Sequence, residues 1–204
     1  MNELFSIAGK VAVITGAGGV LGGNIAQHFV QQGAKVVAID IRQEQLDNRV
    51  AELKQYGQDV IGIIGDVLDI ASLEKVAEET GTYIYLEPLN RYQDHMLNTL
   101  EDAVGIIDKG GFKRVKITAD FYHMAIEEDD ISESLRKYKD YIGHIHIAEN
   151  HRYQPGTGSI DWARHMKTLK EIGYEGPVVN EGRIRGEDPL KVYQESVDFM
   201  KQFM

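Results

Sequence analysis

The sequence contains no cysteine, so disulfide bonds and thiolate metal ligands are excluded. This absence fits a reducing compartment. No apolar run approaches the length needed to span a membrane, and residues 1–10 lack the basic start and long apolar core of a secretory signal. We therefore expect a cytoplasmic protein.

Basic residues are also too few to form a strongly positive surface. The chain has 22 Lys and Arg against 32 Asp and Glu, a formal net charge of −10. This balance argues against nucleic acid or an anionic membrane as a partner. The hydrophobic content of 43% and the charged content of 26% are ordinary for a globular protein. A length of 204 residues is enough for one good-sized domain or two small ones.

Short apolar runs recur along the whole chain, separated by stretches in which apolar residues follow helical spacing. The runs that are typical of buried parallel strands are residues 10–15, 35–40, 59–65, 83–87, 114–120, 142–148 and 177–181. Seven strand–helix units predict an α/β protein with parallel strands. A complete eightfold barrel usually needs about 250 residues. We therefore expect one compact body, either an incomplete barrel or an open parallel sheet.

The composition changes sharply near residue 80. Nine of the ten tyrosines and six of the seven histidines lie beyond that point. We expect two parts, residues 1–80 and 81–204, which pack directly against each other because no low-complexity linker separates them.

A glycine-rich segment, TGAGGVLG (15–22), lies between a predicted strand and a predicted helix. In that context glycines let the backbone approach a pyrophosphate, and the helix N-terminus supplies free N–H groups. An acid at the end of the next strand can accept hydrogen bonds from the adenosine ribose and repel a 2′-phosphate, which favours NAD over NADP. The candidate cofactor-binding residues are Gly16, Gly18, Gly22, Asp40, Asp66 and Val67.

Residues 8–79 resemble the short-chain dehydrogenase/reductase family, which implies half of a Rossmann domain. The family fingerprint T-G-x-x-x-G-x-G is matched at Thr15, Gly16 and Gly22, whereas Val20 replaces the middle glycine. The chain contains no Tyr-x-x-x-Lys, the pair that serves acid–base catalysis in that family. The glycines can serve a tight turn alone, so NAD binding and a purely structural role both stay open.

Four potential metal ligands lie at or near the carboxyl ends of four successive predicted strands. They are Glu87, Asp120, His146 and Glu181, about one strand–helix unit apart. In a parallel barrel these strand ends converge on one face. Three carboxylates and one imidazole form an oxygen-rich set that suits Mn²⁺, Mg²⁺ or Co²⁺. His144 points to the same side of its strand as His146 and is an alternative ligand.

The segments around these residues are LEPLNRYQ (86–93), DFYHM (120–124), HIHIAENHR (144–152) and PGTGSIDW (155–162). They resemble the sugar-phosphate isomerase/epimerase superfamily, which has a xylose-isomerase-like TIM barrel, and within it the tagatose and psicose 3-epimerases. The resemblance covers residues 82–204 and corresponds to the last four strand–helix units of the barrel. The part before it resembles a different family.

The resemblance implies that Glu87, Asp120, His146 and Glu181 bind the metal and that Glu87 and Glu181 are also the catalytic acid–base pair. It implies that His123 and Arg152 bind substrate oxygens. Where simple ketohexose epimerases have a glutamate six residues after the first ligand, this chain has Gln93. This difference leaves room for a keto-glycoside or another sugar derivative.

Two partial folds in one chain indicate a recombined protein, either engineered or a natural fusion. We expect a metal-dependent keto-sugar epimerase-like site with low or absent turnover. An NAD-dependent oxidoreductase and a non-catalytic chimeric scaffold are the alternatives. Exposed strand edges recruit partners, so a homodimer or a closed seven-stranded body is expected. Three histidines in helical or loop contexts, His28, His95 and His165, are expected on the surface.

Overall fold

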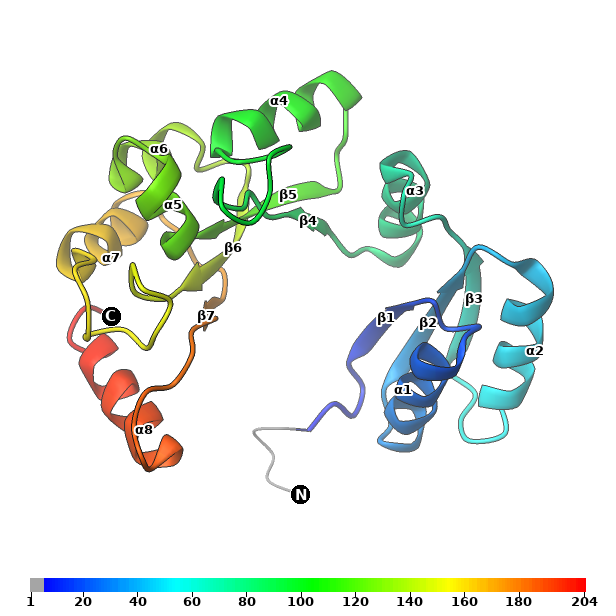
Figure 1. Ribbon diagram of the computed structural model, residues 1–204. Helices are drawn as coiled ribbons and strands as arrows, with labels where there is room; N and C mark the ends of the chain where they lie inside the picture. Colours follow the sequence, from blue (N-terminus) through cyan, green and yellow to red (C-terminus); the bar gives the residue numbers. More distant parts are fainter. Residues whose placement is uncertain (1–5) are drawn as a thin grey trace. The chain divides into compact units, whose positions relative to one another are not determined.

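The computed structural model describes residues 6–204, which form seven strands and eight helices (Figure 1). Strands and helices alternate except between β5 and β6, where two helices follow one another. The strands are β1 (Val11–Thr15), β2 (Lys35–Asp40), β3 (Val60–Ile64), β4 (Ile84–Leu86), β5 (Val115–Asp120), β6 (Ile142–Ile147) and β7 (Val178–Asn180). All the strand pairs are parallel. The α/β fold with parallel strands is confirmed, and each predicted strand end lies within one residue of the observed one.

The strands form two sheets rather than one. The first sheet has the order β1-β2-β3 and the second the order β4-β5-β6-β7. The chain divides accordingly into two compact units between Thr82 and Tyr83. Strand pairing is confined to each unit.

The first unit is built around β1-β2-β3, and both faces of its central strand are covered. Its helices are α1 (Val20–Gln31), α2 (Gln43–Leu53) and α3 (Ile70–Thr80). Val36 packs in a cluster with Val30 of α1 and Leu53 of α2, whereas Val37 clusters with Val76 of α3. Neighbouring strand residues point to opposite faces, so α1 and α2 cover one face and α3 packs on the other. This arrangement is typical of a doubly wound sheet.

The second unit carries the remaining helices around β4-β5-β6-β7. They are α4 (Leu100–Gly110), α5 (Phe121–Glu127), α6 (Ile131–Lys137), α7 (Trp162–Glu171) and α8 (Pro189–Met200). α4 begins at Leu100. Thr99 caps it in a reciprocal capping box with Asp102, which fixes the start of the helix. Within residues 6–204, no helix is both long and apolar enough to cross a membrane.

Candidate metal centre

The sheet of the second unit brings the four predicted ligands to one edge. Glu87 follows β4 directly, Asp120 ends β5, and Glu181 follows β7 directly. His146 lies in β6 and pairs in register with Asp120. Since all four strands are parallel, their carboxyl ends lie at the same edge of the sheet. The strand pairing thus places residues that are far apart in the sequence side by side.

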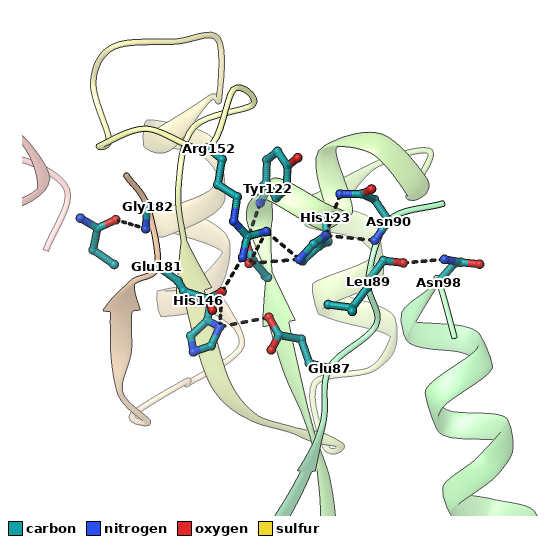
Figure 2. A network of polar contacts seen from close by, with 12 residues as sticks. Glu87, Leu89, Asn90, Asn98, Tyr122, His123, His146, Arg152, Glu181 and Gly182 are labelled. Carbon is teal, nitrogen blue, oxygen red and sulfur yellow. Dashed lines mark hydrogen bonds and ion pairs between the residues drawn. The ribbon is translucent and has the colours of Figure 1, made fainter. Parts of the chain in front are cut away.

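The four side chains offer ligand atoms that all lie within 4.8 Å of one another. His146 Nδ1 lies 3.1 Å from Glu87 Oε1 and 3.1 Å from Glu181 Oε2 (Figure 2). Three carboxylates and an imidazole converge here, a set that suits a hard divalent cation. The group is capable of holding a metal ion.

Asp120 is the buried member of the group, and one of its oxygens lacks a hydrogen bond. Oδ1 accepts the N–H of Tyr122 at 2.8 Å and caps α5. Oδ2 accepts no hydrogen bond from the described residues. Burial raises the pKa of Asp120 to about 7, and the negative charges of Glu87 and Glu181 push in the same direction. A cation would satisfy this oxygen and favour the charged carboxylate, so the residues present fit a metal.

A second group, formed by His123 and Arg152, adjoins the carboxylates. The Arg152 guanidinium donates to Glu181 Oε2 at 3.0 Å, and its Nη1 lies 2.9 Å from His123 Nε2. It also lies 4.6 Å from the centre of the Tyr122 ring. Figure 2 shows Arg152, His123 and Glu181 pointing toward one another. Burial lowers the pKa of His123 to about 4, and the positive charge of Arg152 adds to this effect, so His123 is neutral at pH 7.

The loop that carries Arg152 is held by Glu149, a carboxylate that is only 1% exposed. Oε1 accepts from the Gly156 N–H and from Trp162 Nε1, both at 2.7 Å, and Oε2 accepts from the Ile160 N–H at 3.2 Å. Arg152 itself has φ +60°, a backbone conformation that is uncommon outside glycine. The contacts of the loop therefore maintain a local backbone that the arginine alone would not favour.

The candidate cofactor residues lie at the carboxyl edge of the other sheet, in the first unit. Gly16, Gly18 and Gly22 belong to the loop and first turn after β1, Asp40 ends β2, and the dipeptide 66–67 follows β3. A Cβ at Gly22 would lie 2.5 Å from the Gly16 carbonyl oxygen, so this turn requires glycine. The glycines therefore have a structural role whether or not they bind a cofactor.

The Asp40 carboxylate contacts the glycine-rich loop directly. It accepts the Gly18 N–H at 3.0 Å and the Arg42 main-chain N–H at 3.1 Å. Burial alone would raise the pKa of Asp40, but the hydrogen bonds from Arg42 and Gly18 outweigh it and lower the pKa. Asp40 is thus charged and placed beside the loop. The pairing with Arg42 was not foreseen from the sequence.

Sequence reasoning missed Asn90 and Glu149 and misplaced His165. Asn90 is fully buried, and both its main-chain and side-chain nitrogens face His123 Nδ1. His165 is only 6% exposed and lies 2.8 Å from the Ser132 hydroxyl, so the expectation of a surface residue is wrong. Asn90 follows LEPL (86–89) in a loop, where the sequence carries no signal for burial. The His144 ring meets the His146 ring edge to face, with 4.8 Å between the ring centres, and His144 is not part of the ligand group.

Two family models match the chain, over different and partly overlapping stretches. The model described as a xylose isomerase-like TIM barrel matches residues 67–203. The model described as a short chain dehydrogenase matches residues 10–87.

The curated relatives that the chain matches are sugar epimerases. A 3-dehydro-D-guloside 4-epimerase of Escherichia coli (strain K12) is 53% identical over 129 residues, which is 63% of this chain and 49% of that protein. A D-psicose 3-epimerase of Enterocloster bolteae is 38% identical over 136 residues, 64% of this chain and 45% of that protein. The chain thus spans about half the length of the curated relatives it matches.

A solved structure gives the same relationship. The apo crystal structure of a 3-keto-D-glucoside 4-epimerase from E. coli aligns with a TM-score of 0.66 and 35% identity, covering 95% of this chain and 78% of that one. The TIM-barrel model matches more than half of the chain. The chain therefore belongs to the xylose isomerase-like TIM barrel family.

Proposed function

We propose that the second unit binds a divalent cation through Glu87, Asp120, His146 and Glu181 and acts on a keto sugar. The observation that carries this proposal is the convergence of their ligand atoms within 4.8 Å of one another. Mn²⁺ is the cation we expect, with Mg²⁺ and Co²⁺ as close substitutes, because oxygen-rich sites suit these ions.

The bound cation would supply Lewis-acid polarisation of the substrate carbonyl and the neighbouring hydroxyl. Glu87 and Glu181 form the acid–base pair: one removes the proton from the carbon next to the carbonyl, and the other returns a proton to the opposite face. Solvent then resets the two carboxyl groups. His123 and Arg152 hold substrate oxygens, since both groups carry N–H donors beside the carboxylates.

The substrate class that we propose is a keto-glycoside or a related keto sugar rather than a free ketohexose. Two of the relatives are named for 3-dehydro-D-guloside and 3-keto-D-glucoside. Gln93, in place of the glutamate of simple ketohexose epimerases, is exposed beside the site loop and agrees with this choice.

We also propose that turnover of this chain is low, and that its two parts come from recombination of a dehydrogenase-like and an epimerase-like sequence. Support for recombination comes from the two family models, which match residues 10–87 and 67–203. The groups that do chemistry lie in the second unit, but the chain spans about half of its curated relatives. We expect part of the substrate pocket to require segments that the chain does not share with these relatives, and a misplacement of about 1 Å can cost about a hundredfold in rate.

NAD binding by the first unit is the second candidate function. The specific observation in its favour is the glycine-rich loop at a helix N-terminus, with the charged Asp40 against it. An NAD-dependent oxidoreductase activity lacks the family's catalytic tyrosine and lysine. A non-catalytic chimeric scaffold is the outcome if neither Mn²⁺ nor NAD⁺ binds.

Solvent-deuterium exchange tests the proposed chemistry, because it registers proton abstraction even when turnover is poor. In D₂O with Mn²⁺, deuterium should enter the carbon next to the carbonyl of a 3-keto-D-glucoside, and more slowly that of D-psicose. Glu87→Gln should lower the exchange rate by at least about a hundredfold, the scale of a lost general base. The exposed Glu187→Gln is the matched control and should keep the rate. Exchange that persists in Glu87→Gln, or none in the native chain, would contradict the proposal.

A further inference from the structure

Both ring nitrogens of His123 face hydrogen-bond donors, which is an unusual environment for a neutral histidine. Nδ1 lies 3.0 Å from the Asn90 main-chain nitrogen and 2.9 Å from Asn90 Nδ2. On the other side of the ring, Nε2 lies 2.9 Å from Arg152 Nη1. Figure 2 shows the ring between these two residues. A neutral imidazole has one N–H and one lone pair, so it cannot accept on both sides.

The main-chain N–H of Asn90 decides which ring nitrogen carries the proton. A backbone amide can only donate, so Nδ1 must present its lone pair to it. The single proton of the ring is then on Nε2. This assignment follows from a partner that has no alternative role.

The side chain of Asn90 supports the same tautomer, and its own orientation is fixed independently. Asn90 Oδ1 accepts the main-chain N–H of Tyr92 at 3.1 Å, which identifies the oxygen of the amide. The amide nitrogen must therefore be the atom that faces His123. The residue is fully buried, so water does not compete for these bonds.

The loop that carries Asn90 is tied to the helix that carries His123. The Arg91 guanidinium pairs with Glu127 of α5 at 2.8 Å, and the Arg91 main-chain N–H donates to the same carboxylate at 2.6 Å. Asn98 closes the loop by donating to the Leu89 carbonyl oxygen. Neighbouring contacts thus hold both Asn90 and His123 in place.

With the proton on Nε2, His123 and Arg152 direct two donors at one another. Two donors cannot satisfy each other, but both can donate to an oxygen placed between them. Asp120 Oδ2 lies 3.7 Å from Nε2 and 4.0 Å from Arg152 Nη1, beyond hydrogen-bond distance. The space beside these three groups therefore favours an acceptor oxygen from a ligand.

We propose that Asn90 is a positioning residue that holds His123 in the Nε2–H tautomer, so that His123 donates to a substrate oxygen. The inference rests on the proposed role of His123 in substrate binding, which it deepens. Asn90 acts through His123 and does not itself contact the substrate.

The direct test is the tautomer of His123 in the native chain, read from the ¹⁵N shifts and proton couplings of the histidine rings by NMR. His123→Gln identifies the signals by their loss. The expected result is a lone pair on Nδ1 and a proton on Nε2, in metal-free samples and in samples with the diamagnetic Mg²⁺. A proton on Nδ1, or a ring protonated on both nitrogens at pH 7.5, would overturn the proposal without any further variant.

Asn90→Asp is the variant that removes the side-chain donor from His123 and keeps the main-chain donor. It keeps the size of the side chain and the oxygen that caps Tyr92, but it places an acceptor where Nδ2 donates. The main-chain N–H of residue 90 still donates to Nδ1, so we expect the proton to stay on Nε2 and the Nδ1 ¹⁵N signal to shift as one of its two donors is lost. The affinity for a 3-keto-D-glucoside should fall about tenfold, equivalent to about 1.4 kcal/mol. Affinity for Mn²⁺ should stay within about threefold, because Asn90 is not one of the four ligands.

Asn98→Asp is the matched control in the same loop, since it also removes amide donation but does not touch His123. It should leave the tautomer on Nε2. An unchanged sugar affinity in Asn90→Asp, or an equal loss of sugar affinity in Asn98→Asp, would show that Asn90 does not position His123. Absence of Mn²⁺ binding or of deuterium exchange would defeat the proposed function but leave the tautomer result standing.

Discussion

At the level of a single residue, Asp120 carries the largest unsatisfied polar environment in the proposed metal centre. Its Oδ2 is buried without a hydrogen bond, and two further carboxylates lie against it. An unsatisfied buried polar atom costs on the order of 1–3 kcal/mol. Such a cost is expected where the group serves binding.

Metal-free protein should become more stable when this carboxylate is removed. Burial raises the pKa of Asp120 to about 7 from 3.8, so between about pH 4 and 7 the folded state binds the extra proton. The stabilisation that the Asp120 carboxyl group contributes is therefore fully present below pH 4 and is lost as the pH rises through 7. At pH 7.5 without metal, Asp120→Asn should melt at a higher temperature than the native chain. Its free energy of unfolding should be larger by on the order of 1 kcal/mol. The difference should shrink toward pH 4.

Thermal melts of the two proteins from pH 4 to 8 measure this difference. Burial lowers the pKa of His123 to about 4 from 6.5, so its contribution changes in the opposite sense, falling as the pH falls from 6.5. Because both proteins contain His123, its effect cancels in the comparison. Added Mn²⁺ should stabilise the native chain and not Asp120→Asn. The account would be contradicted if the stability advantage of Asp120→Asn over the native chain were smaller at pH 7.5 than at pH 4.

The residues that the sequence could identify are those tied to strand ends and to distinctive motifs. Glu87, Asp120, His146 and Glu181 were found because one ligand follows each strand, and the sheet then places them together. Asn90 and Glu149 could not be found this way. Their roles depend on which loop atoms meet them, and loop conformation has no periodicity to read.

At the level of elements, the loop between β6 and α7 is the piece that the sequence described least well. Arg152 was foreseen as a substrate contact, but its position depends on φ +60° and on the three hydrogen bonds of Glu149. The strands, by contrast, could be placed to within one residue, because buried apolar runs of parallel strands are continuous. The start of α4 depends on a local contact, the Thr99 cap.

Glu149→Gln should destabilise this loop more than it weakens metal binding. A glutamine nitrogen would replace the oxygen that accepts the Ile160 N–H and would set donor against donor. We expect a loss of about 1–3 kcal/mol in unfolding free energy. The affinity for a 3-keto-D-glucoside should fall more than that for Mn²⁺, because Arg152 is not a metal ligand.

Denaturant unfolding and the two titrations measure these effects. The matched control is the exposed Glu187→Gln, which should change stability by less than about 0.5 kcal/mol. Equal losses of sugar and metal affinity in Glu149→Gln would mean that Glu149 supports the whole site rather than the Arg152 loop.

On the scale of the whole molecule, two units resemble different families, and each has its candidate site at the carboxyl edge of its own sheet. The sequence indicated the change near residue 80 through tyrosine and histidine usage. It did not indicate that the strands would divide into two sheets, because strand propensity does not specify which strands pair. The homodimer expected from exposed strand edges stays a prediction.

The first unit should bind NAD⁺ more tightly than NADP⁺ if its glycine-rich loop is functional. Asp40 is charged and lies against Gly18, so it should repel a 2′-phosphate. Asp40→Ala should narrow the difference between the cofactors, and Asp40→Asn should do so while keeping the size of the side chain. Calorimetric titration with both cofactors is the measurement. Equal affinities in the native chain, or no binding at millimolar concentrations, would assign residues 8–79 a purely structural role.

Calorimetric titration of Mn²⁺ into metal-free protein tests the central claim, a preformed cation site at the edge of β4-β5-β6-β7, most directly. We predict saturable binding of one cation per chain, with the proton release that a carboxylate of raised pKa gives on binding a metal. Glu181→Gln should weaken this binding at least about tenfold, and Glu187→Gln should leave it unchanged. No saturable binding by the native chain, or equal binding by Glu181→Gln, would contradict the assignment of the four residues as a metal centre.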